Sequence, residues 1–211
     1  MNTVNVCETF VSLQGESSYA GLPCFFIRLA GCNLHCRYCD TAYARAPGRE
    51  TPVAELVARV RSDRAPLCEI TGGEPLLQPG FPALARAVKD ETGKTLLVET
   101  NGSCDLSLVP EGAIAVMDVK CPGSGEGESF AMANLGRLRP CDEVKFVLAD
   151  ETDYRWALEF VEKRRLTSLC HAVLFSPVHS ALDARVLANW MLRDRVPARL
   201  QLQWHRQLGM R

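Results

Sequence analysis

Unbroken apolar runs alternate with amphipathic helical segments along most of this chain. The run 113–119 is hydrophobic without a break, which is typical of a strand buried on both faces of a parallel sheet. Apolar residues recur at helical spacing in the segments 53–60 and 81–88. About six strand and helix repeats favour a parallel sheet built from right-handed crossovers. Because a closed barrel needs eight repeats, the sequence predicts an α/β fold with a partial (β/α)6 barrel, regular or modified.

Turn residues and helix caps separate these repeats. We expect strands or extended segments at 4–13, 24–30, 67–71, 95–100, 113–119, 143–149, 172–175 and 199–204. We expect helices after an N-cap at Thr51 with a first-turn Pro52, at 81–88, at 130–138, after an N-cap at Thr152, and at 182–192. No linker or low-complexity segment interrupts the pattern, so we expect a single domain over residues 1–211.

The residues with unusual chemistry follow the ends of the expected strands. In parallel α/β folds, functional groups concentrate at the carboxyl ends of the strands. The segments in question are Cys32–Cys39, Gly72–Pro75, Glu99–Asn101, Asp118–Lys120 and Ser176–Pro177. We therefore expect all of them to lie on one rim of the barrel.

Three cysteines stand at C-x3-C-x2-C spacing, at Cys32, Cys36 and Cys39. Closely spaced thiolates are the ligands of iron–sulfur clusters, and a four-iron cluster with three protein ligands keeps one iron open. A zinc site is the alternative, with His35 inside the loop as a fourth ligand. The chain has ten cysteines, and the other seven are scattered, as expected for core or surface thiols.

Charge and hydropathy exclude several classes of protein. The 24 Lys and Arg residues nearly balance 25 Asp and Glu residues, and no basic run is present. We therefore expect a small-molecule ligand and no nucleic-acid partner. No apolar run approaches the roughly 20 residues that span a bilayer, so we expect no membrane association. Many single cysteines without a signal peptide indicate a reducing, cytoplasmic location.

The cysteine loop after one expected strand, followed by Gly72-Gly73-Glu74-Pro75 after the next, resembles the radical S-adenosylmethionine (SAM) superfamily. The resemblance implies a 4Fe-4S cluster on Cys32, Cys36 and Cys39, whose open iron chelates the methionine end of SAM. An electron from the cluster then cleaves SAM to a 5′-deoxyadenosyl radical. We expect Gly72 and Gly73 to admit the methionine end, where a side chain would collide.

The flanking segments narrow the resemblance to one family. Segments similar to the 7-carboxy-7-deazaguanine synthase family cover nearly the whole chain, at Ser12–Glu16, Phe26–Cys32, Cys39–Thr41, Ile70–Pro75, Glu99–Ser103, Glu143–Val147 and Leu200–Arg211. The resemblance implies a carbon–nitrogen lyase of queuosine biosynthesis. Such an enzyme contracts the ring of 6-carboxy-5,6,7,8-tetrahydropterin to 7-carboxy-7-deazaguanine with loss of ammonia. It uses SAM, a 4Fe-4S cluster and Mg²⁺.

The same resemblance assigns substrate contacts. It places against the pterin Leu13, Gln14, Gly15, Glu16, Arg28, Thr71 and Arg211. The amide of Gln14 and the carboxylate of Glu16 suit the donors and acceptors of an aminopyrimidinone edge. The fork of Arg28 suits a carboxylate. Arg211 would act through the last carboxylate of the chain.

The family pattern also assigns cofactor contacts. The residues that it implies bind SAM are Tyr38, Cys39, Asp40, Gly73, Asp118, Val119, Lys120 and Ser176. It also implies that the hydroxyl of Thr41 binds Mg²⁺. Two positions depart from the pattern. Many relatives have Ser-Pro-Lys where this chain has Asp118-Val119-Lys120, and Gln-Pro where it has Ser176-Pro177. Lys145 and His205 fit a site role and an ordinary strand-end role equally well.

Two other functions fit parts of the sequence. A glycyl-radical activating enzyme also carries C-x3-C-x2-C but acts on a protein. A non-catalytic zinc-binding interaction module would use the cysteines without chemistry. The resemblance assigns no abstracting side chain, because the radical comes from SAM. It further implies a flavodoxin or ferredoxin-type electron donor and a homodimer.

Overall fold

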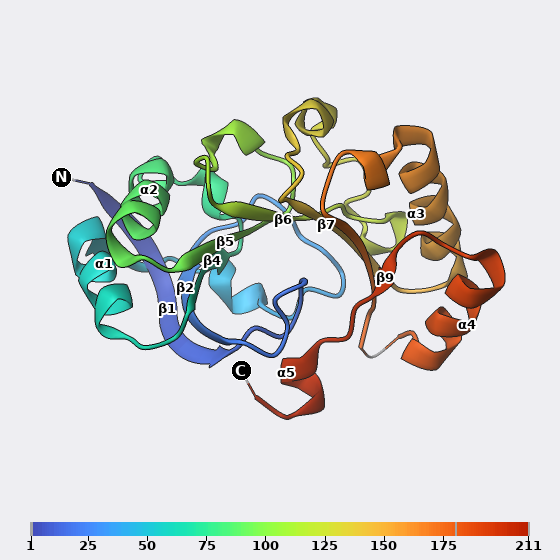
Figure 1. The fold of residues 1–211 in the computed structure, drawn as a ribbon, viewed down its shortest axis with the longest axis horizontal. Helices are drawn as coiled ribbons and strands as arrows, with labels where there is room; N and C mark the ends of the chain where they lie inside the picture. Colours follow the sequence, from blue (N-terminus) through green and yellow to red (C-terminus); the bar gives the residue numbers. More distant parts are fainter. Residues whose placement is uncertain (1, 180, 211) are drawn as a thin grey trace.

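A computed structural model describes residues 2–179 and 181–210 of the chain. In it one sheet of nine strands curves around a central space (Figure 1). The strands are β1 (Thr3–Leu13), β2 (Pro23–Leu29), β3 (Arg49–Pro52), β4 (Leu67–Gly72), β5 (Thr95–Thr100), β6 (Ile114–Asp118), β7 (Glu143–Leu148), β8 (Ala172–Pro177) and β9 (Arg199–Leu200). Their order is β3-β1-β2-β4-β5-β6-β7-β8-β9.

The direction of the strands confirms the partial barrel. Every neighbouring pair from β2 to β9 is parallel. β1 pairs antiparallel with both β2 and β3, and so extends the sheet beyond the repeats. Strand β3 was not expected from the sequence, because its residues Arg49–Pro52 lack an apolar run.

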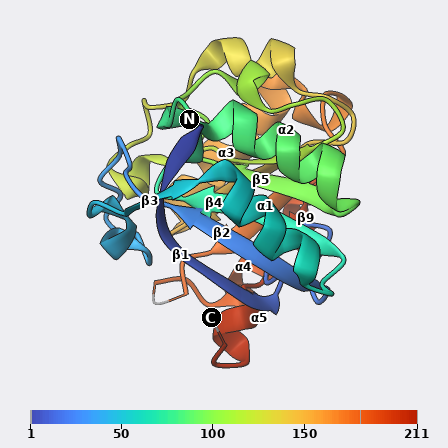
Figure 2. The same cartoon turned by 90° about the vertical axis from the view of Figure 1, so that its left-hand side faces the viewer.

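The helices lie on the outer face of the sheet (Figures 1 and 2). They are α1 (Val53–Ser62), α2 (Phe81–Thr92), α3 (Glu151–Arg164) and α4 (Ala184–Asp194), whereas a short α5 (Trp204–Gln207) lies against the loop after β1, near the end of the chain. The helix expected at 130–138 is a 3-10 helix over Met132–Arg137. Short 3-10 turns therefore replace α-helices after β5 and β6.

Several helix starts differ from the sequence prediction. Asp150, and not Thr152, caps α3, and its side chain accepts from the Asp153 N–H at 2.9 Å. Thr51 does not cap α1, because it belongs to β3 and its hydroxyl donates to the Arg49 carbonyl. Helix α4 starts two residues later than expected, after a cap at Asp183. Thr51 is not a cap because the fold places it in β3, whereas Asp150 and Asp183 are ordinary N-cap residues within two positions of the expected helix starts.

The last strand is also shorter than predicted. β9 ends at Leu200, and Trp204 begins α5. The Trp204 N–H donates to the Gly15 carbonyl at 3.0 Å, which turns the chain away from the sheet and toward the loop after β1. The end of the chain therefore lies across the open end of the barrel.

Apolar side chains fill two regions of the protein. The larger core lies between the sheet and the outer helices. A smaller cluster plugs the interior of the barrel and contains Cys24, Phe26, Leu67, Leu97 and Ile114, with Phe10 and Tyr19 packed on it. The space above this plug is the cavity described below. No helix within residues 2–179 and 181–210 is both long enough and apolar enough to cross a membrane.

Candidate active site

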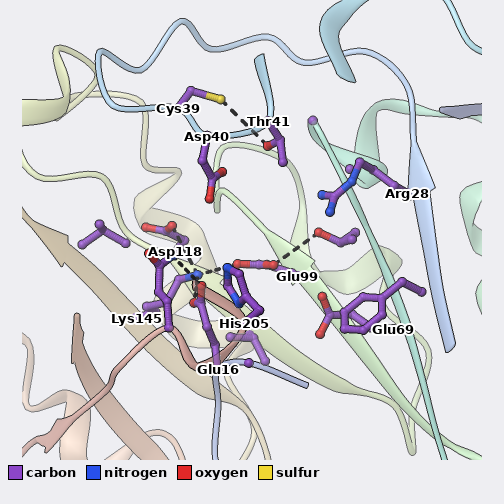
Figure 3. Close-up of a pocket in the computed structure, with 18 of the residues that line it drawn as sticks. Glu16, Arg28, Cys39, Asp40, Thr41, Glu69, Glu99, Asp118, Lys145 and His205 are labelled. Carbon is purple, nitrogen blue, oxygen red and sulfur yellow. Dashed lines mark hydrogen bonds and ion pairs between the residues drawn. The ribbon is translucent and has the colours of Figure 1, made fainter. Parts of the chain in front are cut away.

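A cavity of about 860 Å³ opens at the carboxyl ends of the parallel strands (Figure 3). Most of the residues that the sequence assigned to the site line this cavity. They are Leu13, Gln14, Gly15, Glu16, Arg28, Cys32, Cys36, Tyr38, Cys39, Asp40, Thr41, Thr71, Gly73, Asp118 and Lys120. Val119 and Ser176 are fully buried and are not among the lining residues. Arg211 lies outside the described residues. The structure thus brings most of the expected residues together on one rim.

The cysteine loop is fixed to this rim by backbone hydrogen bonds. The Gly31 N–H donates to the Ala44 carbonyl at 2.7 Å, and the Arg37 N–H donates to the Ser124 carbonyl at 2.9 Å. The His35 N–H donates to the Glu126 carboxylate at 2.7 Å. His35 is thereby part of the anchoring of the loop. The three motif thiols are half-buried and face the cavity.

Gly73 is required by the cysteine loop itself. A Cβ at Gly73 would clash with the Gly31 carbonyl oxygen and lie 2.6 Å from the Cys32 Cβ. A Cβ at Gly72 would likewise clash with the Leu29 backbone. The expected reason for the two glycines, room for a ligand, is therefore incomplete. Their missing side chains let the loop after β4 pack directly on the loop that carries the cysteines.

Glu74 joins two neighbouring loops of the rim. Its buried carboxylate accepts from the Leu76 N–H at 3.0 Å, the Asn101 N–H at 2.6 Å and the Thr100 hydroxyl at 2.9 Å. Burial raises the pKa of Glu74, although these donors oppose the rise. Glu74 is therefore a structural residue that holds the loops after β4 and β5 in register.

Lys145 lies at the centre of a cluster of carboxylates. Its Nζ lies 2.6 Å from Glu16 Oε2 and 3.7 Å from Asp118 Oδ2, and it also pairs with Glu99. Burial alone would lower the pKa of Lys145, but these carboxylates raise it well above its usual value. Burial would raise the pKa of Glu99, yet Lys145, Lys120 and Arg28 outweigh that effect and lower it to about 2. Lys145 and Glu99 are therefore both charged.

The loop after β1 uses its polar side chains internally. Gln14 Oε1 accepts from the Glu16 N–H at 2.8 Å, and Gln14 Nε2 donates to Glu69 Oε2. The second carboxylate oxygen of Glu16 accepts from Gln203 Nε2 at 2.8 Å. Gln14 and Glu16 were expected to bind the aminopyrimidinone edge of a substrate. In the structure they also hold this loop against β4, β7 and the end of the chain.

Arg28 projects from β2 at the opposite side of the cavity from Lys145 (Figure 3). Its Nε donates to Glu8 Oε1 at 3.0 Å, and its guanidinium lies 5.7 Å from the centre of the Phe10 ring. Phe10 stacks on Phe26 with ring centres 4.8 Å apart. This side of the cavity therefore combines a fixed positive charge with a flat apolar wall.

The remaining charged groups lie near the cysteine loop. Lys120 Nζ donates to Asp118 Oδ2 at 2.9 Å, whereas Asp118 Oδ1 is buried and has no hydrogen-bond partner among the described residues. The Tyr38 hydroxyl donates to the Val147 carbonyl at 3.0 Å. Cys39 Sγ lies 3.9 Å from the Thr41 hydroxyl (Figure 3). Asp118 thus offers a free acceptor beside the thiols.

The end of the chain covers part of the opening. Gly15 packs on the His205 ring so closely that a Cβ would overlap the ring. Arg206 pairs with Asp40 at 2.9 Å. We call residues 201–210 the C-terminal strap, since they cross from β9 to the cysteine loop.

The 7-carboxy-7-deazaguanine synthase of Koribacter versatilis is 43% identical in an alignment of 219 positions that covers 96% of this chain and 96% of the relative. That of Chlorobaculum tepidum is 44% identical and covers 97% of this chain and 94% of the relative. The chain belongs to the 7-carboxy-7-deazaguanine synthase family.

Fold comparison agrees with this family. The Radical SAM superfamily profile matches residues 26–117 of this synthase-family chain. A crystal structure of QueE from Escherichia coli matches with a TM-score of 0.76 at 21% identity, and covers 96% of this chain and 95% of that one. Streptococcus suis SuiB matches with a TM-score of 0.56 at 11% identity, over 82% of this chain and 47% of that one. These likenesses support the fold.

Membership of the radical SAM superfamily implies a 4Fe-4S cluster and SAM, and the chemistry of the residues at the cavity suits both groups. The three thiols at C-x3-C-x2-C spacing are half-buried and line one cavity, and closely spaced cysteine thiolates are the ligands of iron–sulfur clusters. Beside them, Lys120 provides a cation, and Asp118 Oδ1 is an acceptor without a partner among the described residues; the zwitterionic methionine end of SAM would need one group of each kind.

The sequence alone did not identify several residues of the cavity in this synthase-family chain. Glu69, Gln203 and Arg206 line it without a motif. For Glu69 a signal was present, since it is a single acid inside the otherwise uncharged strand segment 67–71. Lys145, which fitted two roles from the sequence, is the most connected cation of the site.

Proposed function

We propose that this protein is a radical SAM carbon–nitrogen lyase that converts 6-carboxy-5,6,7,8-tetrahydropterin to 7-carboxy-7-deazaguanine with loss of ammonia. This reaction belongs to the biosynthesis of queuosine and other 7-deazapurines. One observation carries the proposal: the three motif thiols and the loop Leu13–Glu16 line the same cavity in a chain of this family. A cavity of about 860 Å³ with both polar groups and an aromatic wall also suits a pterin better than the protein substrate of an activating enzyme.

The cavity divides into a cofactor side and a substrate side. Cys32, Cys36 and Cys39 would hold the 4Fe-4S cluster, which supplies the electron for SAM cleavage when bound. SAM would lie along Tyr38, Cys39, Asp40, Gly73 and the loop Asp118–Lys120, and Ser176 would support this side from beneath. The substrate would lie against Leu13–Glu16, Arg28 and Thr71, with Arg211 at the open end.

The residues around the substrate side would orient the pterin and exclude water. Lys145 holds Glu16 and Glu99 in fixed positions, so both carboxylates are set before a ligand enters. Thr71 donates to Glu99 Oε2 at 3.2 Å and connects this group to the wall below Arg28. Such fixed polar groups favour one orientation of a bound ring.

Mg²⁺ is part of the same proposal. The hydroxyl of Thr41 lies on the cavity beside Asp40, at the junction of the two sides. One protein hydroxyl suits an ion that keeps several waters and takes further oxygens from its substrate. The carboxylate of the pterin would provide such oxygens.

The remaining parts of the proposal concern the setting of the enzyme. The unbroken nine-stranded sheet supports a single radical SAM domain over 1–211. Ten free cysteines support a reducing cytoplasm. A flavodoxin or ferredoxin-type protein would supply the electron, and the family resemblance supports a homodimer.

A direct assay tests the activity. Protein reconstituted anaerobically with iron and sulfide is incubated with SAM, a reductant and 6-carboxytetrahydropterin, and products are separated by mass. We expect 7-carboxy-7-deazaguanine and 5′-deoxyadenosine. Reductive SAM cleavage without a deazapurine would contradict the assigned substrate. A colourless protein that retains zinc would instead support the non-catalytic alternative.

A further inference from the structure

Glu69 is a buried carboxyl group that the description of the reaction leaves unused. It lies in the middle of β4, with Phe26 of β2 and Leu97 of β5 as its neighbours in the sheet. Both neighbours belong to the apolar plug of the barrel. Glu69 is only 4% exposed, yet it lines the cavity, and Figure 3 shows its carboxyl group directed into that space. It therefore forms the polar part of the cavity floor.

One oxygen of Glu69 is committed and the other is not. The Glu16 N–H can only donate, so it fixes the Gln14 amide with Oε1 toward Glu16. Gln14 Nε2 must then face β4, where it donates to Glu69 Oε2. Among the described residues, Glu69 Oε1 has no hydrogen-bond partner. The Glu16 N–H thus fixes the orientation of the Gln14 amide, and the Gln14 amide occupies Oε2 of Glu69. Oε1 is the oxygen that is left for a ligand.

A carboxyl group at this position needs a reason beyond stability. Burying a polar group without full hydrogen bonding is unfavourable, and an apolar residue would continue the plug. Burial raises the pKa of Glu69 well above its usual value, with Glu99 and Glu16 adding to the rise and Lys145 and Gln14 opposing it. The group is thus held ready to accept hydrogen bonds that would favour its ionised form.

The surroundings of Glu69 match one part of a pterin. An aminopyrimidinone ring presents a ring N–H and an exocyclic amine side by side, and Glu69 keeps its free Oε1 and the second lone pair of Oε2 for such a pair of donors. Phe10 and Phe26 provide a flat wall beside the floor. Arg28 is level with Thr71, which lies two residues beyond Glu69 on β4. This separation of about 7 Å along the strand is comparable with the length of a two-ring heterocycle.

We propose that Glu69 recognises the aminopyrimidinone edge of the substrate and makes the enzyme specific for rings that carry the 2-amino group. The inference rests on the proposed function and names the residue that reads this edge. Arg28 then receives the carboxylate at the far end of the ring. Gln14 acts as a positioning residue, because it orients Glu69 through the bond that the Glu16 backbone enforces.

The experiment compares two ligands that differ only in the 2-amino group. The dissociation constants of 7-carboxy-7-deazaguanine and 7-carboxy-7-deazahypoxanthine are measured by calorimetry on cluster-reconstituted protein with SAM. We expect the wild type to prefer the 2-amino ligand by about 10- to 100-fold, the usual effect of hydrogen bonds to a charged group. In Glu69→Gln and Glu69→Ala the preference should fall below about 3-fold.

Glu143→Gln is the matched control. Glu143 is also fully buried and accepts from the Ser18 N–H at 3.1 and 3.0 Å, but it is not among the residues that line the cavity. This variant should keep the preference of the wild type. If it lost the preference as Glu69→Gln does, a general effect of removing a buried carboxyl group would replace our explanation.

The outcomes separate the two proposals. A wild type that makes deazapurine but binds both ligands equally overturns the role of Glu69 and leaves the proposed function intact. The role of Glu69 is likewise overturned, and the proposed function left intact, if folded Glu69 variants keep the preference for the 2-amino ligand. A wild type that neither binds 7-carboxy-7-deazaguanine nor forms it contradicts the proposed function. The wild-type comparison needs no variant, so the test stands even if the substitutions prevent folding.

Discussion

Lys145 Nζ lies 2.6 Å from Glu16 Oε2, although 129 residues separate the two along the chain. The contact joins β7 to the loop after β1 across the interior of the barrel. Because Glu99 and Asp118 meet the same ammonium group, one lysine neutralises much of the acidic lining of the cavity. The arrangement of the site therefore depends on this residue.

Replacing Lys145 by Met should destabilise the fold and disturb the site. Removing one partner of a buried ion pair costs about 3–5 kcal/mol, and we expect about 2–3 kcal/mol here because Glu99 keeps some contact with solvent. In the wild type the depressed pKa of Glu99 adds stability above its unfolded pKa, which is lost as the pH falls toward about 2. Urea unfolding at several pH values should show that the variant loses this dependence. An unchanged profile would contradict the assigned ion pair.

Gly73→Ala should impair cluster assembly without unfolding the protein. The added Cβ would collide with Gly31 and Cys32, so the cysteine loop has to move. Iron and sulfide per chain after anaerobic reconstitution should fall several-fold, while far-UV circular dichroism stays unchanged. Gly136→Ala is the control, because a Cβ there meets nothing within 4 Å. Equal iron content in the two variants would disprove the steric argument.

The stability difference between Glu69→Gln and the wild type should depend on pH. A carboxyl whose folded pKa is raised favours the folded state at low pH, and this contribution is lost as the pH rises toward the folded pKa. The amide does not titrate. The melting temperature of the variant relative to wild type should therefore increase by a few degrees between pH 5 and pH 8, since 1 kcal/mol corresponds to about 2–4 °C at this size. A constant difference across this range would argue against the raised pKa.

Arg206→Ala should weaken substrate binding and leave the fold stable. Arg206 and Asp40 are each more than one-third exposed, so their ion pair contributes less than about 1 kcal/mol. Loosening the C-terminal strap should raise KM for the pterin by about 2- to 5-fold at low salt, with little change in melting temperature. As the salt concentration increases, the KM of the wild type should rise toward the KM of the variant, because salt screens the ion pair. A loss of kcat with unchanged KM would point to another role.

Short-range patterns in the sequence, such as the spacing of apolar residues, predicted most strands and helices and the rim on which the site lies. Strand and helix periodicity identified the parallel sheet, and strand ends located the rim, because side-chain direction follows from the backbone repeat. The cysteine spacing likewise indicated a functional loop, and its three thiols line the cavity. Strand β3, the steric role of Gly73 and the partners of Lys145 depend on segments that are far apart in the sequence and meet only in the folded chain. The caps of α3 and α4 are local, and Asp150 and Asp183 lie within two residues of the expected helix starts.

The first loop and the last helix meet over the cavity, through Gly15 with Trp204 and Asp40 with Arg206. The members of each pair are far apart in the sequence, and Gln203, His205 and Arg206 of the strap line the cavity with the motif thiols. Part of the wall around the thiols is therefore built by a distant segment, and it is complete only when the whole barrel between the two segments has folded.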